Sequence, residues 1–397
     1  MLVPKWRFKR EDGTDYPEWE EKAITDLCED IVGGGTPSTD NKAYWSGDIA
    51  WVSSSDLENN NIHHLSMTRF ITENAITNSA TKRIPYNSIL IVSRVGVGKV
   101  AIAPCELCTS QDFTNLVNPI CNPIFLGYLL SLTMQIKANG VQGTSIKGVT
   151  AKEIKQYYLS IPHIEEQQKI ADFLSTVDEV IAQSEAEVQN LEQQKKAAMQ
   201  KIFSQEVRFK REDGTEYPEW VESTIGEEMS FVNGKAHENC EDDNGDYIIV
   251  NSKFISTNGE VIRKTNTVLV PLHIGDIVMV MSDVPNGKAM SKCLVIDKDK
   301  QYTLNQRICV LRSTHKPIFV SAQISRCAYF MSFDDGVKQT NLRKQDVLDC
   351  PLFIADKEEQ QKIADFLSAY DEAISYAKQE LDKWKELKKG LLQQMFV

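Results

Sequence analysis

The sequence has no long apolar run, no cysteine framework and no excess of positive charge. No stretch approaches the roughly 18 apolar residues of a membrane-spanning helix, and the charged start at Trp6 to Arg10 lacks the apolar core of a signal peptide. The nine cysteines are an odd number and recur at no repeated position, so we interpret them as reduced core residues. We therefore expect a cytoplasmic protein.

The net charge of −12 weighs against a protein that binds nucleic acid over its whole surface. Duplex binding depends on lysine and arginine that neutralise phosphates, so any nucleic-acid face here would have to be local. The apolar fraction of 42% and the charged fraction of 25% are those of an ordinary folded protein. Both halves of the chain should therefore fold.

Catalytic motifs are also missing. The glycine-rich Arg94 to Lys99 lacks the strand and helix of a nucleotide-binding unit, and Asn122-Pro123-Ile124-Phe125 lacks the second proline of the adenine methyltransferase motif. Glu153-Ile154-Lys155 has no acidic partner on a preceding strand to make a nuclease site. No histidines have ligand spacing except the adjacent His63 and His64, which suit a polar loop. We expect no catalytic residue, no metal site and no cofactor in this chain.

What the chain does contain is an internal repeat. Arg7 to Trp19 returns as Arg208 to Trp220 with one conservative change, and Glu165 to Ser175 returns unaltered as Glu358 to Ser368. The stretches between the repeated blocks share little sequence. A duplicated architecture follows, in which a common frame carries two divergent inserts.

Each half ends in a long amphipathic segment that begins at its Glu-Glu-Gln-Gln block. Apolar residues recur in alternating steps of four and three, which is the pattern of a coiled-coil seam. The second series lies 193 residues after the first, from Ile170 to Ile363 onward, and Lys195 and Lys388 match as polar seam positions. We predict two helices that pair antiparallel through this seam. Its members are Ile170, Leu174, Val177, Ile181, Val188, Leu191 and Ile202, and then Ile363, Leu367, Tyr370, Ile374, Leu381, Trp384, Leu391 and Met395.

The inserts combine short strand-like runs with a few helical stretches, among them a strand at Thr267 to Val270 and a helix at Ile318 to Phe330. The predicted fold is α+β, with two mixed α/β domains joined by two long antiparallel coiled-coil helices in a pseudo-twofold repeat. The predicted boundaries are 1–19 for a segment that closes the repeat, 20–160 for the first domain, 161–207 for the first helix, 208–220 for the repeated connector, 221–353 for the second domain and 354–397 for the second helix.

Several motifs carry a family resemblance. Gly33 to Ser38, Tyr44 to Val52 and Ser55 to Leu57, together with the doubled Glu-Gln-Gln-Lys-Ile-Ala-Asp-Phe-Leu helix start, resemble the specificity subunit of type I restriction-modification enzymes over essentially the full length. The resemblance implies a non-catalytic chain with two target recognition domains, each reading one half of a bipartite double-stranded DNA sequence, and two helices that set the spacing between them.

The resemblance also implies partners. Two adenine methyltransferase subunits would carry S-adenosylmethionine, and restriction and translocase subunits would carry ATP and Mg; no membrane is involved. In the second insert, Asn233-Gly234-Lys235-Ala236-His237 stands where the first has its Gly-Gly-Thr-Pro stretch, and the loss of Gly33-Gly34-Gly35-Thr36 suggests a different half-site.

Bases are read by arginine, lysine, asparagine, glutamine, serine and threonine on rigid loops. Two polar loops stand at matching places just before the long helices and supply most of the candidates, and scattered basic residues and the glycine-rich turn supply the rest. The candidate DNA-binding residues are Gly34, Thr36, Ser38, Ser54, Arg94, Lys99, Gln142, Thr144, Ser145, Lys147, Lys235, Lys253, Lys288, Arg307, Lys338, Gln339, Thr340, Asn341, Arg343 and Lys344.

Two alternatives stay open at this point. One is the recognition subunit of a system in which methylase and nuclease are fused in the partner. The other is a coiled-coil scaffold that binds proteins and no DNA, which the acidic total charge favours.

Overall fold

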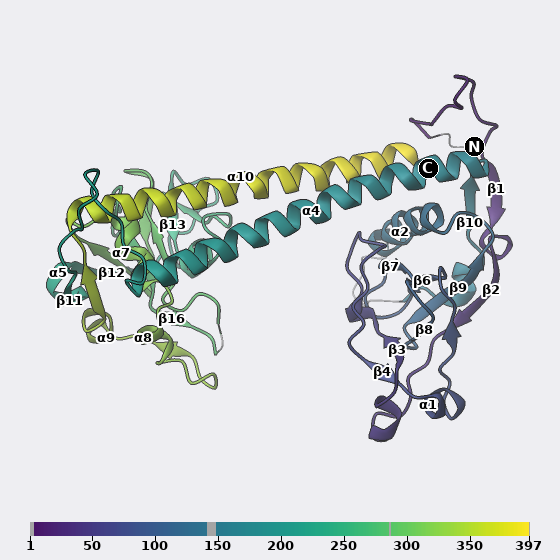
Figure 1. The fold of residues 1–397 in the computed structure, drawn as a ribbon, viewed down its shortest axis with the longest axis horizontal. Helices are drawn as coiled ribbons and strands as arrows, with labels where there is room; N and C mark the ends of the chain where they lie inside the picture. The colour runs from purple at the N-terminus through teal and green to yellow at the C-terminus, as the bar shows by residue number, and fades with distance from the viewer. Residues whose placement is uncertain (1–3, 141–147, 286, 397) are drawn as a thin grey trace. The chain divides into compact units, whose positions relative to one another are not determined.

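The computed structural model describes residues 4–140, 148–285 and 287–396, and it divides into two compact units (Figure 1). Unit 1 comprises Met1–Ala186 and Gln379–Val397, and unit 2 comprises Glu187–Lys378. Each unit holds one insert and one part of each of two long helices, α4 (Ile164–Phe203) and α10 (Lys357–Met395). Within the described ranges, no helix is long and apolar enough to cross a membrane.

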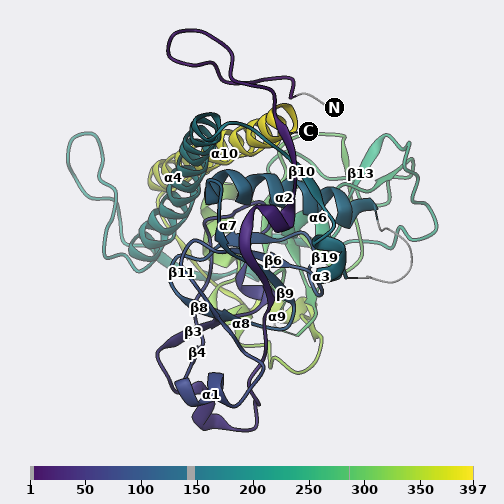
Figure 2. The same ribbon diagram turned by 90° about the vertical axis from the view of Figure 1, so that its right-hand side faces the viewer.

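Unit 1 is built on two four-stranded sheets. The first has the order β2-β9-β6-β7, with bounds Cys28–Gly33, Phe113–Pro119, Ile89–Val92 and Val100–Ile102. The second has the order β4-β3-β8-β5, with bounds Phe70–Ile71, Ile49–Val52, Leu107–Thr109 and Arg83–Ile84. Strands β1 (Glu20–Ala23) and β10 (Tyr158–Ile161) pair antiparallel beside them (Figure 2). Ile161 therefore ends a strand, and the long helix begins only at Ile164.

Helix α2 (Pro123–Gly140) covers one face of the first sheet over β6 and β7 (Figure 1). The side-chain oxygen of Asn122 accepts the backbone N–H groups of Ile124 (2.9 Å) and Phe125 (3.0 Å), and Pro123 follows it at the first helical position. The Asn-Pro-Ile-Phe sequence is thus a helix start. The short helices of unit 1 are α1 (Glu73–Thr77) and α3 (Ala151–Ile154).

Unit 2 repeats the strand order of the first sheet and that of three of the four strands of the second sheet, although its sequence differs. Its first sheet has the order β12-β19-β15-β17, with bounds Ser230–Asn233, Ile308–Arg312, Ile277–Val280 and Cys293–Val295. Its second sheet has the order β14-β13-β18, with bounds Lys264–Thr265, Tyr247–Val250 and Tyr302–Leu304. Two further pairs are β11 (Val221–Thr224) with β21 (Pro351–Ile354), and β16 (Ser282–Asp283) with β20 (Thr340–Asn341). The two inserts are therefore versions of one mixed fold.

Two local predictions in unit 2 were wrong. Thr267 to Val270 forms no strand; these residues lie in a loop after β14, which pairs antiparallel with β13. The predicted helix from Ile318 to Phe330 is broken into α7 (Pro317–Ile324) and α8 (Ala328–Met331), since Arg326 adopts a left-handed φ of 52° between them. The remaining helices are α5 (Ile225–Glu228), α6 (Ser252–Ser256) and α9 (Lys344–Leu348).

The repeated sequence blocks meet around a buried carboxylate in each unit. Glu359 is fully buried at the start of α10, where it accepts hydrogen bonds from Arg208 Nη2 at 2.8 Å, Arg208 Nε at 3.2 Å and Trp220 Nε1 at 2.9 Å. Glu166 in α4 makes the same contacts with Arg7 and Trp19 at 2.8, 3.1 and 3.3 Å. The hydrogen-bonded carboxylate raises the pKa of each arginine. In both units the repeated residues thus hold the connector against the start of the long helix through a buried carboxylate, and we call this set of contacts the lock.

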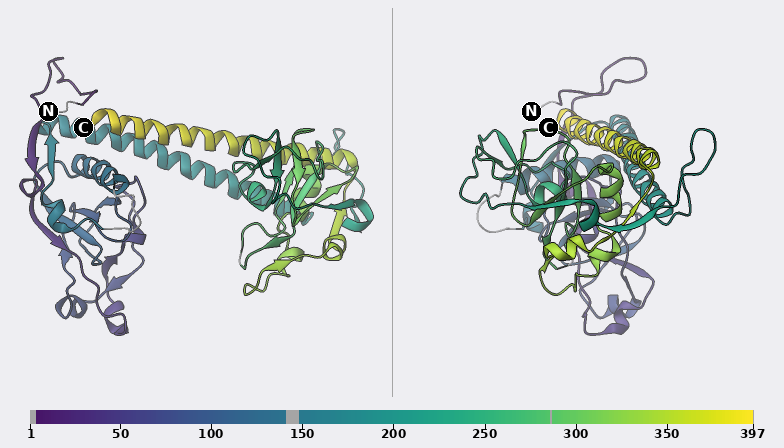
Figure 3. Two further views of the ribbon diagram at one scale, coloured as in Figure 1. Left: turned by 180° about the vertical axis from the view of Figure 1, so that it is seen from behind. Right: turned by 90° about the vertical axis from the view of Figure 1, so that its left-hand side faces the viewer.

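Segments near the two chain ends lie together in unit 1 (Figure 3). Trp6 N donates to the carbonyl of Gln394 at 3.1 Å, and the Phe396 ring lies 5.5 Å from that of Phe125. In unit 2 the unbroken chain makes the equivalent contact, Val207 N to the carbonyl of Lys201 at 3.1 Å. The hydrogen bond that joins two separate segments in unit 1 therefore matches the one that the continuous chain makes in unit 2.

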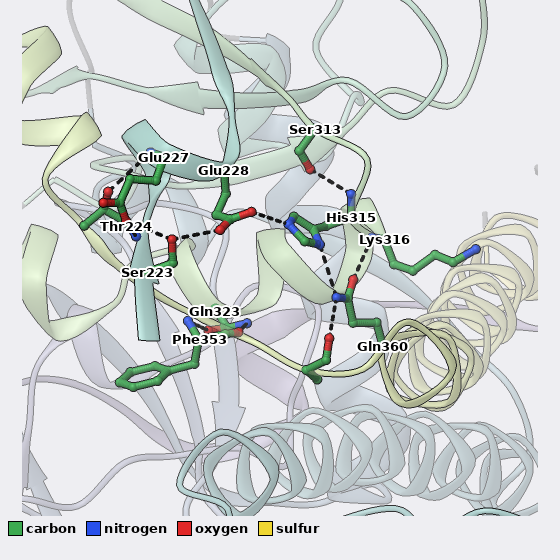
Figure 4. Close-up of polar contacts among 11 residues, drawn as sticks. Ser223, Thr224, Glu227, Glu228, Ser313, His315, Lys316, Gln323, Phe353 and Gln360 are labelled. Carbon is green, nitrogen blue, oxygen red and sulfur yellow. Dashed lines mark hydrogen bonds and ion pairs between the residues drawn. The ribbon is translucent and has the colours of Figure 1, made fainter. Parts of the chain in front are cut away.

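The start of α10 is held by a polar network centred on His315 (Figure 4). His315 Nε2 lies 2.8 Å from Glu228 Oε2, and its Nδ1 lies 3.2 Å from Gln360 Nε2. Gln360 also accepts Lys316 N at 3.1 Å and donates to the carbonyl of Ala355 at 2.8 Å. Because Gln360 offers N–H donors, its amide donates to Nδ1 of His315 while Nε2 donates to Glu228, and this second hydrogen bond lowers the pKa of Glu228.

Four ion pairs join α4 to α10, two in each unit. In unit 1 they are Asp178 to Lys388 (2.5 Å) and Glu185 to Lys385 (2.7 Å). In unit 2 they are Lys195 to Asp371 (2.5 Å) and Glu192 to Lys378 (2.7 Å). Within each unit, the paired residue numbers rise along α4 as they fall along α10. Each unit 2 pair occupies the repeat positions of a unit 1 pair, with α4 and α10 exchanged. The predicted seam residues are buried or half-buried, and Lys388 is 6% exposed.

Replacing Arg208 tests the lock. Arg208→Ala leaves the Glu359 carboxylate buried without its cation, so we expect unit 2 to lose about 3 kcal/mol of stability or more. The control is Lys210→Ala, because the Lys210 to Glu216 pair at 3.4 Å is exposed and is worth at most about 1 kcal/mol. Urea unfolding followed by circular dichroism measures both. Equal shifts in the two variants would contradict the lock.

Candidate nucleic-acid interface

Backbone hydrogen bonds hold four polar loops side by side in unit 2. Asn305 N donates to the carbonyl of Val250 at 3.0 Å, Met281 N to that of Arg307 at 2.8 Å, and Leu342 N to that of Met281 at 2.8 Å. The loops follow β13, β18 and β15 and precede α9. We call the set 251–253, 305–307, 281–285 and 338–342 the loop row of unit 2. Strand ends fix the loops, so their side chains are presented from a rigid base.

Unit 1 contains the same ladder of hydrogen bonds. Ser110 N donates to the carbonyl of Val52 at 2.9 Å, Ser93 N to that of Asp112 at 2.8 Å, and Val149 N to that of Ser93 at 2.8 Å. The loop row of unit 1 is accordingly 53–55, 110–112, 93–98 and 148–149. The two rows share these backbone hydrogen bonds and differ in their side chains.

The glycine-rich turn of unit 1 packs against its loop row. A Cβ on Gly34 would stand 2.1 Å from the carbonyl oxygen of Ser110, and Gly35 N donates to the carbonyl of Thr109 at 2.8 Å. The Thr36 hydroxyl donates to Gln111 Oε1 at 2.6 Å, and the Ser38 carbonyl accepts Trp45 Nε1 at 3.1 Å. Close approach of the backbone accounts for these glycines without a phosphate.

Unit 2 has a glycine, Gly234, at the same close approach of the backbone. A Cβ on Gly234 would lie 1.8 Å from the carbonyl oxygen of Asn305, and Lys235 N donates to the carbonyl of Leu304 at 3.2 Å. Of the motif that the second insert was expected to lose, one glycine position is therefore kept. Gly234 replaces Gly34, and Lys235 occupies the place of Gly35 with its side chain exposed.

The loop row of unit 2 opens into a cleft of about 410 Å³. Two predicted residues, Lys253 and Arg307, lie in its wall together with residues that sequence reasoning missed; the full lining is Glu238, Asn251, Ser252, Lys253, Arg263, Asn305, Gln306 and Arg307. Glu241 pairs with Arg263 at 3.0 Å, so three cations stand against two carboxylates and the cleft keeps a local surplus of one positive charge in an acidic chain. Amides and a guanidinium on a basic surface are the groups that read base edges.

Asn305 is held in place from behind. His237 is 1% exposed, and its Nδ1 lies 2.9 Å from the carbonyl oxygen of Lys235 while its Nε2 lies 3.0 Å from Thr303 Oγ1. The backbone N–H of His237 donates to Asn305 Oδ1 at 3.2 Å. The oxygen of Asn305 thus faces the fold, and its amide N–H groups have no acceptor in the described part of the chain.

The polar loop before α9 is partly committed to the fold. Gln339 Nε2 donates to Ser282 Oγ at 2.7 Å, and that hydroxyl donates to Asn341 Oδ1 at 2.6 Å. Thr340 is buried, and Lys338 is exposed.

The next two predicted residues stabilise the neighbouring elements. Arg343 forms a two-pronged contact with Asp346 at 3.0 and 3.2 Å, and Lys344 Nζ lies 5.5 Å from the centre of the Phe231 ring.

In unit 1, Lys99 is engaged within the fold, where its Nζ donates to the carbonyls of Ser54 (3.1 Å) and Leu57 (2.7 Å). Lys292 does the same in unit 2 toward Ser256 at 2.9 Å, and burial lowers its pKa. Arg94 and, in unit 2, Lys288 are exposed. The predicted residues Gln142, Thr144, Ser145 and Lys147 lie outside the described residues.

Asn305, Gln306, Arg263, Ser282 and Gln111 were missed because no local pattern marks them. One signal was available for two of them: Asn305 and Gln306 directly follow a short strand, as Ser110 and Gln111 do in the first insert. Only the strand order shows that these two turns are equivalent.

The chain belongs to a family. The model of the type I restriction modification DNA specificity domain matches residues 16–193 and again 217–385. This places the chain in the type I restriction-modification specificity family, with one copy of the domain in each half.

Relatives by sequence are similar over part of the chain. The type I restriction enzyme MjaIX specificity subunit of Methanocaldococcus jannaschii is 37% identical over 203 residues, which are 48% of this chain and 46% of that protein. The EcoR124I/EcoR124II specificity subunit of Escherichia coli is 31% identical over 156 residues, 37% of this chain and 38% of that protein. The chain thus matches less than half the length of these relatives.

The fold also occurs in a solved structure. The specificity subunit of a type I restriction-modification system from M. genitalium superposes with a TM-score of 0.55 at 16% identity, covering 100% of this chain and 99% of that one. The resemblance in sequence and the fold therefore agree.

A substitution at Gly34 tests the packing of the glycine turn. The added Cβ of Gly34→Ala meets the Ser110 carbonyl, so we expect a loss of about 1 to 3 kcal/mol in the stability of unit 1. Gly33→Ala is the matched control, because its nearest atom would be the Phe113 carbonyl oxygen at 4.0 Å. Thermal unfolding compares the two. A stable Gly34→Ala variant would show that the turn does not need the close approach.

Proposed function

We propose that this chain is the DNA-recognition subunit of a type I restriction-modification enzyme, and that it reads a bipartite target with one loop row per unit. It carries no chemistry of its own. Adenine methyltransferase subunits and restriction subunits supply the reactions, with S-adenosylmethionine, ATP and Mg bound on those partners.

One observation carries the proposal: the same backbone ladder presents two different sets of base-reading side chains. A duplicated scaffold with identical side chains would read two identical half-sites. Here Asn305, Gln306 and Arg307 stand in unit 2 where Ser110, Gln111 and Asp112 stand in unit 1. Different donors and acceptors at equivalent positions select different bases, which suits a target with two unlike halves.

Local charge supports DNA over a protein partner as the ligand of unit 2. Lys253, Arg263 and Arg307 gather in one cleft of a chain whose net charge is −12. Phosphate contacts need only a local surplus of cations. A scaffold that used its acidic surface would have no need to concentrate basic and amide groups in a cleft.

We further propose that α4 and α10 pair as an antiparallel coiled coil that sets the distance between the half-sites. The four ion pairs between the helices support this pairing, as does the burial of the seam. The exposed Gln189, Gln193, Lys196 and Gln200 offer a polar helix face to two methyltransferase subunits. The target adenine would then be flipped into the pocket of such a partner.

The chain should direct methylation to a split motif. Co-expression with the methyltransferase subunit it serves, followed by mapping of methylated adenines in the host genome, should give two short half-sites separated by a fixed gap. The readout is the same for a separate methyltransferase and for a fused methylase-nuclease. No methylated split motif, combined with DNA binding that is insensitive to salt, would favour the protein scaffold instead.

Lengthening both helices tests the spacing role. Seven residues added after Ala186 in α4 and seven after Lys378 in α10 keep every ion pair within its own unit. One heptad adds about 10 Å, so we expect the gap to grow by about 3 base pairs, at roughly 3.4 Å each, with both half-sites unchanged. Methylation mapping reads the result. Seven residues inserted beside Gly259, in a surface turn, should leave the gap unaltered. Altered half-sites in the lengthened chain would contradict the spacer.

A further inference from the structure

We propose that Arg307 reads a guanine in the half-site bound by unit 2, and that its strained backbone is retained for this purpose. The inference rests on the proposed function and adds a residue and a base to it.

The backbone at Arg307 is unusual. Its φ is 65°, in the left-handed region that favours glycine and asparagine. Its backbone is held on both sides. Met281 N donates a hydrogen bond to the Arg307 carbonyl, and the next residue, Ile308, begins β19. Asp112, the equivalent residue in unit 1, is not among the residues with positive φ. A glycine would meet the backbone demand of this turn without strain, so the side chain of Arg307 needs another reason to be present.

The guanidinium of Arg307 is also unengaged. The other arginines of unit 2 have partners: Arg208 binds Glu359, Arg211 lies over Tyr217, Arg263 pairs with Glu241, Arg312 with Asp276, Arg326 reaches backbone carbonyls and Arg343 binds Asp346. Arg307 is exposed in the cleft wall, and its side chain makes no hydrogen bond or ion pair within the described residues. Its N–H donors are therefore available to a ligand.

The chemistry of the site points to guanine. A guanidinium donates two parallel N–H groups, which match O6 and N7 of guanine in the major groove. The neighbouring Lys253 is exposed as well and can neutralise a phosphate, and Asn305 offers amide donors beside it. In unit 1 the same position carries Asp112, whose carboxylate can only accept and so cannot bind those two guanine acceptors. At this equivalent position, the side chain of unit 2 offers hydrogen-bond donors and that of unit 1 offers acceptors.

The variant Arg307→Gly separates recognition from folding. Glycine relieves the backbone strain, so the melting temperature of the chain should stay the same or rise. Co-expressed with the methyltransferase, the variant should lose discrimination at one guanine of one half-site by roughly 5- to 150-fold, the range for a bidentate contact, while the other half-site is unchanged. Deep sequencing of methylated adenines across a randomised target gives this ratio.

The control is Lys300→Gly. Lys300 is also exposed in unit 2 with a left-handed φ of 56°, but it does not line the cleft. The substitution should raise or preserve the melting temperature and leave the motif intact. Arg307→Lys keeps the charge and can still donate to guanine but lacks the planar fork, so it should lose less discrimination at the guanine than Arg307→Gly does.

Three results overturn the inference. An unchanged motif in Arg307→Gly shows that Arg307 reads no base. Uniform weakening on all sequences with a smaller salt dependence assigns the side chain to a phosphate. Unfolding of Arg307→Gly beside a stable Lys300→Gly shows a structural role. If methylation mapping with the unaltered chain finds no split motif, the proposed function is wrong, and the guanine assignment fails with it.

Discussion

A buried glutamate at the start of each long helix is the constraint on which the structure depends. Glu166 and Glu359 are fully buried, and each is balanced by an arginine and a tryptophan from the repeated connector. A carboxylate without water is stable only when its partners stay in place. The lock therefore fixes where each helix begins relative to its insert, and in unit 1 the same connector segment also receives the C-terminal end of α10.

This constraint allows the inserts to diverge. The connector and the helix start must be kept because they bury charge together, whereas loop-row side chains such as Gln111 in unit 1 and Arg307 in unit 2 are exposed and lie outside the core. Unit 1 and unit 2 show the result: the hydrogen-bond ladder is common to both, and Ser110-Gln111-Asp112 has become Asn305-Gln306-Arg307. Under the proposed function, recognition can thus change on a scaffold whose fold does not.

Sequence reasoning identified what depends on repetition and periodicity. The duplicated frame and the mixed α+β inserts were predictable because identical blocks and short strand-like runs are visible along the chain. The strand expected at Thr267 to Val270 was wrong because four apolar residues cannot show whether a partner strand is in reach. The candidate Lys99 turned out to serve backbone carbonyls, and Asn305 escaped notice, because exposure and hydrogen-bond partners are properties of contacts between distant segments.

By itself the sequence determined that the protein is two copies of one design, since a repeat of identical blocks specifies identical local structure. It also determined the family, through motifs that include Gly33 to Ser38. Only the tertiary structure decided that Gly234 is the counterpart of Gly34, that the first sheets of the two inserts share one strand order, and that the exposed Arg307 adopts a left-handed φ in the wall of a cleft. These facts arise from backbone segments brought together across many residues of chain, and no local pattern records that proximity.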